Sequence, residues 1–455
     1  MTNITPNGEL VLREISLESA TIKSIKPCQK RIQYRAVINW LTKYKPHANA
    51  SNLEQVKGYL EAFHHLYEVE DWERATTIID ITLNTPTNEK LRDILGTWGY
   101  YQQQKEIYEG LLGKLDNKWE CIFLNGLGNC HFYAGSYQLA IDYFEQGLKI
   151  ANKNYLEKNY RILQNLGSAY YGLGNYNQAN SYLQQSLELA KKTGDRFTEA
   201  GILVNFGHLY DSLGKYNLAR DYFQQALIIS QETNNRSVEG AALGGLGSYY
   251  YSQQKYQEAI TYHFQHLEIA EEIGDRQSIK SASGNIGGAY FSLKEYSAAI
   301  TYLQKTLELT KQMGDLNGEE TALLNLGLIE FELGNLTPAR EYFEKALNIA
   351  REISDRRGEA TILFNLSQCY YRCGKFQQGF TASHKYRKIM AESGVTVNAL
   401  PLPRWYESFL KFSQRGRFKL TLFLLFVLIG FPFVTIAYSM QMLWWRFYTK
   451  FKLPE

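Results

Sequence analysis

The chain has 455 residues, of which 49 are basic and 46 acidic, so its formal net charge is only +3. The charges are balanced, and the repeats contain no long run of lysine and arginine. The sequence therefore lacks the basic surface that binds nucleic acid, and no nucleic-acid partner is predicted. The five cysteines are an odd number scattered along the chain, which does not indicate a disulfide framework. Glu9, Arg13 and Glu14 precede any apolar core, so we expect no secretory signal.

The first part of the chain is irregular. Residues 1–55 are expected to form an N-terminal arm or cap, with one helical stretch around Trp40. Residues 56–118 have apolar residues at helical spacing without a constant period, and we interpret them as degenerate helical repeats.

From residue 119 onward a unit of constant length recurs. Its most visible mark is a triplet, most often asparagine, an apolar residue and glycine, that begins at Asn165, Asn205, Gly245, Asn285, Asn325 and Asn365. A period of about 40 residues predicts a solenoid of stacked helix pairs. We count seven such units, in residues 119–394.

Residues 159–194 illustrate the pattern within one unit. Two apolar stripes at helical spacing lie on either side of Gly174, which is typical of a residue that ends a helix. Gly167 and Ala179 are small, and we expect them to let the two helices of the pair approach closely. A larger side chain at Gly167 would push the helices apart.

The turns between units are also periodic. Asp195, Asn235, Asp275, Asp315 and Asp355 are placed to cap the helix that follows each of them. Arginines follow four of these caps, at Arg196, Arg236, Arg276 and Arg356. Three of them have a glutamate three residues later, with which they can pair across one turn. A second interpretation is that the arginines line a groove edge and hold the carboxylates of a partner.

Leu166, Gly167, Tyr170 and Ala179, with their copies, resemble the tetratricopeptide repeat pattern. The period and the Gly-Asp-Arg turn at 194–196 are similar to those of a long-repeat subclass. That subclass occurs in kinesin light chains, in spindle-polarity adaptors and in many bacterial, especially cyanobacterial, repeat proteins. The resemblance covers 119–394 strongly and 56–118 weakly. It implies an all-α fold, a right-handed solenoid of helix-turn-helix repeats.

The resemblance also implies a binding surface. In this subclass the asparagine before Leu-Gly faces the concave groove and hydrogen-bonds the backbone of a bound peptide. The corresponding residues here are Asn165, Asn205, Asn285, Asn325 and Asn365, and an amide can both donate to and accept from a peptide group. The alternative is that each asparagine bonds the neighbouring repeat and serves stacking. Gly126 and Gly245 interrupt the series.

The lysine-rich clamp that binds a terminal carboxylate in chaperone-binding relatives is not visible. Arg161 and Arg372 are isolated charges near either end of the array. The expected ligand is therefore an internal segment of a partner protein or peptide.

The C-terminal part has a different character. Residues 395–417, with Pro401 and Pro403, are interpreted as a linker and basic juxtamembrane segment. No charged residue occurs between Leu420 and Trp445, so residues 418–445 are predicted to form a single transmembrane helix, followed by a short tail at 446–455. More basic residues precede this segment than follow it, which predicts that the repeats face the cytoplasm.

Together these features predict a membrane-anchored scaffold that binds a partner peptide in the concave groove and recruits or assembles a complex. The alternative is a signalling or enzymatic protein whose N-terminal region carries an unrecognised activity regulated by the repeats. Self-association through the groove or an end repeat is a third hypothesis. No phosphate loop, nucleophile elbow, zinc-protease or kinase motif occurs, so no catalytic residue and no cofactor are predicted. Cys369 and Cys373 alone do not make a metal site, since structural zinc needs four ligands.

Overall fold

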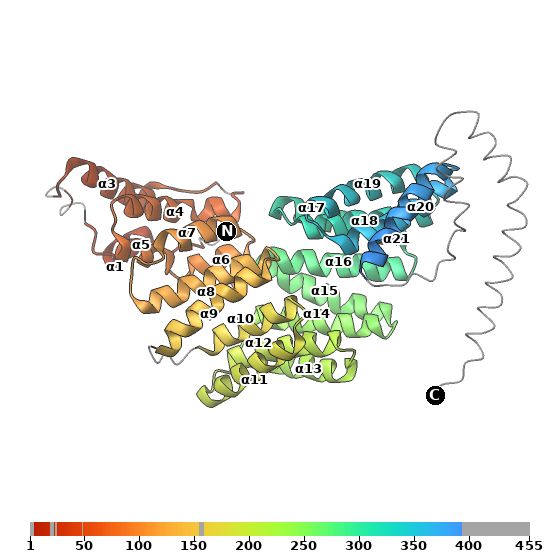
Figure 1. The fold of residues 1–455 in the computed structure, drawn as a ribbon. Coiled ribbons are helices and arrows are strands. Elements are labelled where there is room, and N and C mark those ends of the chain that lie inside the picture. The colour runs from red at the N-terminus through yellow and green to blue at the C-terminus, as the bar shows by residue number, and fades with distance from the viewer. Residues whose placement is uncertain (1–3, 19–21, 23–24, 48, 154–158, 394–455) are drawn as a thin grey trace, which may run out of the picture. The chain divides into compact units, whose positions relative to one another are not determined.

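The computed structural model describes residues 4–18, 22, 25–47, 49–153 and 159–393. The chain divides into two compact units, 1–386 and 387–455, and only residues 387–393 of the second are described. The described residues form α-helices joined by short turns. They contain no β-strand, only an isolated bridge between Thr82 and Lys90. The expected all-α solenoid is confirmed (Figure 1).

The N-terminal region is built from helices of unequal length. They are α1 (Gly8–Glu14), α3 (Cys28–Lys43), α4 (Asn52–Glu68), α5 (Trp72–Ile79), α6 (Leu91–Thr97) and α7 (Tyr101–Leu111). Their apolar faces share one core, which extends from Val11 on α1 through Val37, Phe63 and Ile78 to Leu127 on α8. Residues 8–43 thus contribute helices with buried side chains to this core.

Helix pairs of nearly equal length follow. They are α8 (Asn117–Tyr133) and α9 (Tyr137–Lys153), α10 (Tyr160–Gly172) and α11 (Tyr176–Thr193), α12 (Arg196–Ser212) and α13 (Tyr216–Glu232), α14 (Arg236–Ser252) and α15 (Tyr256–Ile273), α16 (Arg276–Ser292) and α17 (Tyr296–Met313), α18 (Leu316–Glu332) and α19 (Leu336–Glu352), and α20 (Arg356–Arg372) and α21 (Phe376–Glu392). Each helix packs on its partner and on the next pair, as expected for a solenoid.

Local chemistry sets where these helices begin and end. The carboxylate of Asp195 accepts a hydrogen bond from the backbone N–H of Thr198 at 2.9 Å, and Asp275, Asp315 and Asp355 make the same bond in later units. Asn235 accepts from the Val238 N–H at 3.2 Å. The predicted caps are therefore confirmed. Gly174 has a positive φ of 80° where α10 ends, as expected of a glycine in this place.

The glycine of each triplet is where the two helices of a pair meet. A Cβ added at Gly167 would lie 2.7 Å from Cγ of Leu183, and one at Gly207 would lie 2.4 Å from the ring of Phe223. A side chain of the second helix thus fills the space left by the missing Cβ, which confirms the predicted close approach at Gly167. The same contacts recur as Gly128–Phe144, Gly247–His263, Gly287–Leu303 and Gly327–Phe343.

The repeated tyrosines pair with one another inside the units. The rings of Tyr170 and Tyr182 stack with centroids 5.4 Å apart, and three later units repeat the arrangement, with centroid distances of 5.4 Å for Tyr210–Tyr222, 5.1 Å for Tyr250–Tyr262 and 6.0 Å for Tyr290–Tyr302. Such offset pairs stabilise the contact between two helices beyond the apolar area they bury. The abundance of tyrosine therefore reflects packing.

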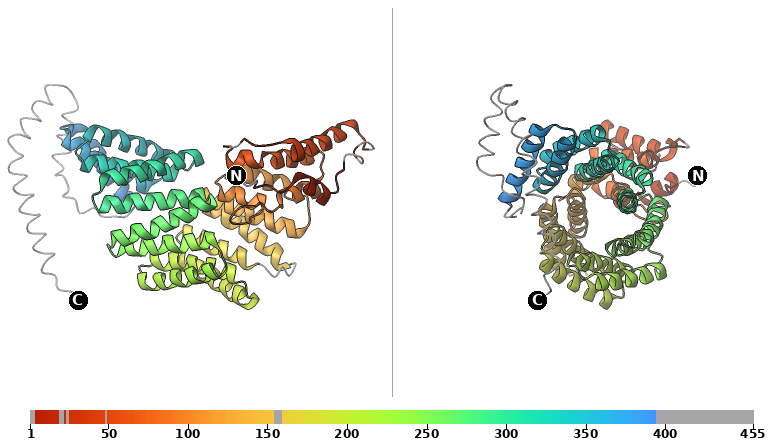
Figure 2. Two further views of the ribbon diagram at one scale, coloured as in Figure 1. Left: turned by 180° about the vertical axis from the view of Figure 1, so that it is seen from behind. Right: turned by 90° about the vertical axis from the view of Figure 1, so that its right-hand side faces the viewer.

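Within the first compact unit (1–386) the described helices wind around an axis, as the right-hand view of Figure 2 shows. The N-terminal region comes back to the middle of the solenoid. A Cβ added at Gly274 would lie 3.3 Å from Nε1 of Trp98, and the Arg276 guanidinium lies 6.0 Å from the ring centroid of Tyr100. Residues 98–100 therefore contact the turn between α15 and α16.

The predicted membrane location is corrected by the structure. Among the described residues, none of the helices is both long and apolar enough to cross a bilayer. The physical reason is that these helices carry polar and charged side chains at their exposed positions, as the alternation of buried and exposed positions along α11 illustrates. The segment 418–445, on which the prediction depended, lies outside the described residues, as do 395–417 and 446–455.

Candidate functional site

The asparagines of the triplets lie on the first helices of successive pairs. Asn165 is on α10, Asn205 on α12, Asn285 on α16, Asn325 on α18 and Asn365 on α20. Asn165 and Asn205 line a cavity of about 270 Å³. Most of the polar side chains around it come from the first helices α8, α10 and α12: Asn129, Gln164, Ser168 and His208. The first helices thus present a polar surface at the repeat step.

Two asparagines are bonded to the preceding unit. The Asn165 Nδ2 donates to Oδ1 of Asn125 at 2.9 Å, and the Asn205 Nδ2 donates to Oγ of Ser168 at 3.0 Å. These bonds cross from one first helix to the next. They occupy one amide donor in each case and leave the side-chain carbonyl oxygen as an acceptor.

The later asparagines differ from these two. Asn365 Nδ2 donates to its own helix, at the carbonyl of Thr361, 3.0 Å away. Asn285 is exposed and Asn325 half-buried, and neither amide makes a hydrogen bond with a described residue. Both amides therefore keep all their donors and acceptors for another molecule. The five asparagines are thus alike in position and unlike in what they contact.

The two gaps in the series have a steric cause. A Cβ at Gly126 would lie 2.2 Å from the ring of Tyr108, and one at Gly245 would lie 2.3 Å from the ring of Phe223. Each ring comes from the preceding helix and fills the position that an asparagine side chain would take. No asparagine fits at either place without moving a buried aromatic residue.

The arginines of the turns contact carboxylates and amides of the chain itself. Arg196 lies 3.0 Å from Glu199 and 2.9 Å from Glu232. Arg236 pairs with Glu239 and Glu272, Arg276 bonds Gln312, and Arg356 lies 3.1 Å from Glu359. The predicted pairs across one turn are confirmed. Three of the arginines also join the first helix of their pair to the end of the second helix, so their guanidinium groups hold the pair together.

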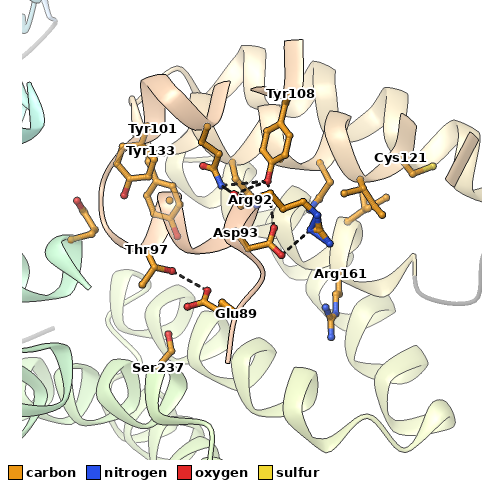
Figure 3. A pocket seen from close by; sticks show the side chains of 18 of the residues that line it. Glu89, Arg92, Asp93, Thr97, Tyr101, Tyr108, Cys121, Tyr133, Arg161 and Ser237 are labelled. Carbon is orange, nitrogen blue, oxygen red and sulfur yellow. Dashed lines mark hydrogen bonds and ion pairs between the residues drawn. The ribbon is translucent and has the colours of Figure 1, made fainter. Parts of the chain in front are cut away.

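A larger cavity, of about 750 Å³, lies where the N-terminal region meets the middle of the solenoid (Figure 3). Its wall comes from α6, α7 and α8, from the start of α10, and from the first residues of α14 and α16. A cavity of this size is in the range that binds small ligands or side chains of a partner.

The larger cavity has charged groups of both signs: Arg92 lies 2.9 Å from Asp93, and Lys118 and Arg161 also line it. Glu89 and Thr97 lie on the side of Tyr101 and Tyr133, while Arg161 lies on the opposite side (Figure 3). Burial raises the pKa of Glu89, and the nearby Asp93 and Asp275 raise it further. Burial also raises the pKa of Asp275. The Tyr133 side chain is about half exposed, and loss of solvent around its hydroxyl, together with the charges of Asp275 and Glu89, raises its pKa to about 12.

The thiols near this cavity are not activated. The buried Cys121 donates to the carbonyl of Gly147 at 3.4 Å, and burial raises its pKa. Burial raises the pKa of Cys130 to about 12. A nucleophilic cysteine needs a lowered pKa, so neither thiol has the environment of one. Among the described residues, no group of three or more His, Cys, Asp or Glu side chains could hold a metal ion.

Sequence reasoning did not find this larger cavity. Asp275 was interpreted only as a helix cap, and Glu89, Thr97 and Tyr101 belong to the irregular region. No spacing in the chain relates residues 89–101 to residues 275–278. The one available signal was the aromatic-rich character of residues 98–101 and of the helix end at 131–133.

Comparison with known proteins gives a family for the repeats. Residues 119–192, 158–232, 238–312 and 318–378 match the family model described as Tetratricopeptide repeat, and together they cover more than half of the chain. No curated protein matches the sequence. The comparisons carry no information on the bacterial group, so the resemblance to cyanobacterial proteins stays a prediction.

Solved structures with a similar fold are distant in sequence. One is a Signal Transduction ATPase with Numerous Domains protein with a tetratricopeptide repeat sensor from Pyrococcus horikoshii. It has 16% identity over 86% of this chain and 64% of that chain, with a TM-score of 0.52. Another is a Rap protein complexed with Competence and Sporulation Factor, with 16% identity over 76% of this chain and 99% of that chain, and a TM-score of 0.50. A putative kinesin light chain from Podosopora anserina has 16% identity over 42% of this chain and 94% of that chain, with a TM-score of 0.36. At these identities the likeness shows the fold alone.

Proposed function

Because this chain belongs to the tetratricopeptide repeat family, we propose that it is a protein-interaction scaffold that binds an extended peptide segment of a partner along its first helices. The observation that carries this proposal is the pair of amides at Asn285 and Asn325. They lie one repeat apart on α16 and α18 and make no hydrogen bond with a described residue. The Rap protein of similar fold is a complex with Competence and Sporulation Factor, which is in keeping with this function.

The chemistry of the surface supports an internal peptide segment as ligand. An extended chain presents alternating N–H and C=O groups, and a primary amide can pair with either. Asn165 and Asn205 each keep an acceptor beside the smaller cavity. Their donors are used between units, so these two residues combine a stacking bond with an acceptor for the ligand. Asn285 and Asn325 are the two positions at which the whole amide is open to the peptide.

The turn arginines have a different role in this proposal. Arg196 and Arg236 each face two carboxylates of the chain, so their charge is already neutralised. Binding a partner's carboxylate would require breaking these pairs. We therefore assign the arginines to the stability of each helix pair, and the asparagines to the ligand.

The experiment is selection from a display library of random peptides on the immobilised full chain, followed by affinity measurement on the selected peptides. The Asn285→Ala/Asn325→Ala variant should bind them at least several-fold more weakly, because each lost hydrogen bond contributes about 1 kcal/mol. The matched control is Gln304→Ala/Asn348→Ala, which removes two exposed amides from the second helices α17 and α19. It should bind as the wild type does.

Two results would refute the proposal. One is that no peptide is enriched over an unrelated helical protein. The other is that the two double variants lose affinity equally, which would place the selected peptides on a surface that does not include the first helices. Circular dichroism and thermal unfolding of each variant ensure that a lost affinity is not a lost fold.

A further inference from the structure

The larger cavity contains an acidic corner that is formed by residues far apart in the sequence. We use this term for Glu89 and Asp275 together with Thr97, Tyr101 and Tyr133, all of which line the cavity. Glu89 precedes α6, and Asp275 caps α16. The two carboxylates line the same cavity, and, besides burial, the charges of Asp93 and Asp275 both raise the pKa of Glu89. The return of the N-terminal region to the turn at Gly274 brings them together.

Glu89 lacks a cationic partner among the described residues. One of its oxygens accepts from the hydroxyl of Thr87 at 2.6 Å and the other from the hydroxyl of Thr97 at 2.9 Å. Asp275 accepts from the backbone N–H of Ser278 at 3.0 Å and from its hydroxyl at 2.8 Å. These neutral donors orient both carboxylates at one wall of a partly enclosed cavity, where burial raises the pKa of each. An arrangement of this kind favours a bound cation.

Four cations on the elements that form the corner have partners elsewhere, although the charge of Lys280 also partly offsets the effect of burial, which raises the pKa of Asp275. Lys90 and Arg92 both contact Asp80, at 3.4 and 2.9 Å, and Arg92 also contacts Asp93 at 2.9 Å. Lys280 pairs with Asp315 at 2.6 Å. Arg276 follows Asp275 directly but its guanidinium bonds Gln312 and lies over Tyr100. None of these side chains neutralises Glu89.

The aromatic wall defines the shape of the cation. Tyr101 and Tyr133 stack with centroids 5.1 Å apart and planes inclined by 18°. Flat faces of this kind attract alkylammonium and, more strongly, planar guanidinium groups. A guanidinium also has the fork of donors that two carboxylates can share. A small hydrated metal ion would use neither the rings nor the depth of the cavity.

From these observations we propose that the acidic corner binds a guanidinium or primary ammonium group on an alkyl chain, namely the arginine or lysine side chain of a peptide bound along the first helices. This inference rests on the proposed function for the source of the cation, but the site itself is independent of it. The smaller cavity is close to the larger one, since Asn129 and Tyr133 line both. A peptide that contacts Asn165 and Asn205 can therefore place one basic side chain in the corner.

The test uses n-butylguanidinium as a probe and n-butylurea, its neutral isostere, as the control ligand, with the full chain observed by saturation-transfer difference NMR. The wild type should bind n-butylguanidinium saturably and n-butylurea at least roughly tenfold more weakly, because charge-assisted hydrogen bonds are the stronger ones. Glu89→Gln and Asp275→Asn should each weaken n-butylguanidinium binding by a similar factor. Asparagine caps the corresponding helix α14 at Asn235, so Asp275→Asn is compatible with the fold.

The matched control variant is Asp355→Asn. Asp355 caps α20 as Asp275 caps α16, but it does not line the cavity. This variant should bind n-butylguanidinium as the wild type does. Equal binding of the charged and neutral probes, absence of saturable binding, or undiminished binding by both Glu89→Gln and Asp275→Asn would overturn the proposed site.

Peptide selection separates this inference from the proposed function. Enrichment of arginine or lysine at one position by the wild type, lost with Asp275→Asn and kept with Asp355→Asn, supports the corner as the anchor of a basic side chain. Selected peptides without a basic residue would overturn that role while the scaffold function stands. If no peptide is enriched, the scaffold function fails, and the n-butylguanidinium measurement alone decides whether the corner is a cation site.

Discussion

Gly287 and Gly288 are neighbours on α16, yet a methyl group added at each would meet different surroundings. At Gly287 the added Cβ would lie 2.8 Å from Cγ of Leu303, on the buried face toward α17. At Gly288 it would meet no atom within 4 Å. The pair therefore separates the packing role of the triplet glycine from the general cost of glycine in a helix.

We expect Gly287→Ala to lower the free energy of unfolding by about 1–3 kcal/mol, the usual effect of overpacking a close contact. Gly288→Ala should leave it unchanged or raise it by up to about 1 kcal/mol, because alanine is the better helix former. Urea unfolding followed by circular dichroism measures both. Equal effects of the two substitutions would show that Gly287 is not required for the approach of α17.

His263 takes a position that other units fill with an apolar residue. Its ring packs against Gly247, where Leu183, Phe223, Leu303 and Phe343 pack against the corresponding glycines. The ring is buried, and its Nδ1 has no hydrogen-bond partner among the described residues. Burial, with a smaller contribution from the nearby His266, lowers the pKa of His263 to about 4. His266 is lowered to about 4 for the same principal reason.

These lowered pKa values predict that the protein loses stability in mild acid. In the unfolded chain a histidine takes up its proton near pH 6.5, whereas in the folded chain His263 does so only near pH 4. Stability is therefore fully present above pH 6.5 and falls as the pH is lowered from 6.5 toward 4. His263→Leu, which copies the residue of two other units, should reduce this loss without lowering stability at pH 7. Thermal unfolding between pH 4.5 and 7.5 measures it.

The control for that experiment is His384→Leu on α21, because His384 is exposed. Its profile of melting temperature against pH should follow the wild type. If His263→Leu follows the wild type as well, the loss of stability in acid arises from other groups.

At the scale of the element, each first helix depends on its cap. Asp195 accepts from the N–H of Thr198 at 2.9 Å, from the hydroxyl of Thr198 at 3.0 Å and from the Tyr160 hydroxyl at 2.7 Å. It thus caps α12 and joins it to α10 through Tyr160. The corresponding residue of the next unit is Asn235, which makes the N–H bond with an amide oxygen.

We expect Asp195→Ala to lower the free energy of unfolding by about 1–2 kcal/mol, since it leaves helix donors without a partner. Asp195→Asn should lose much less, because asparagine caps a helix nearly as well as aspartate. Chemical unfolding of both variants at pH 7 gives the comparison. Similar losses for the two would mean that the charge of Asp195, and not the cap, carries its contribution.

The helix pairs were predictable because their signals are local. Three signals act within one repeat: glycine at the end of a first helix, Asp or Asn at the next helix cap, and the apolar spacing between them. The period of the sequence therefore predicts the period of the helix pairs. The gaps at Gly126 and Gly245 were visible but not explained. Their cause, a ring of Tyr108 or Phe223 from another helix, is a packing contact that spacing alone does not contain.

At the scale of the compact unit 1–386, the contacts that form the larger cavity were not predictable from the sequence. A solenoid is described by contacts between neighbours, and the period says nothing of residues that meet after one turn of the winding. Trp98 and Gly274 contact one another only because the accumulated rotation of the pairs between them brings them together. The same limit holds for the asparagines: their position follows from the period, but the bonds to Asn125 and Ser168 follow from the geometry between units.

The contact between residues 98–100 and the turn at Gly274 can be tested with two arginines, of which only one takes part in it. Arg276 and Arg236 both begin a first helix, and each bonds the end of the following second helix, at Gln312 and Glu272. Only Arg276 also lies over an N-terminal ring, 6.0 Å from the centroid of Tyr100, with its Cβ beside Gly99. Removal of the Arg276 side chain should therefore affect residues far away in the sequence, whereas removal of Arg236 should act only locally.

We expect Arg276→Ala to speed amide hydrogen exchange of residues 98–101 by roughly twofold to fivefold, which corresponds to the loss of an exposed cation–π contact. Arg236→Ala should leave the exchange of these residues unchanged and affect only the peptides around α14 and α15. Exchange followed by mass spectrometry on the full chain resolves both regions in one experiment. Unchanged exchange at 98–101 in both variants would mean that the turn at Gly274 does not hold the N-terminal region, and the acidic corner would then lack the contact that brings Glu89 to Asp275.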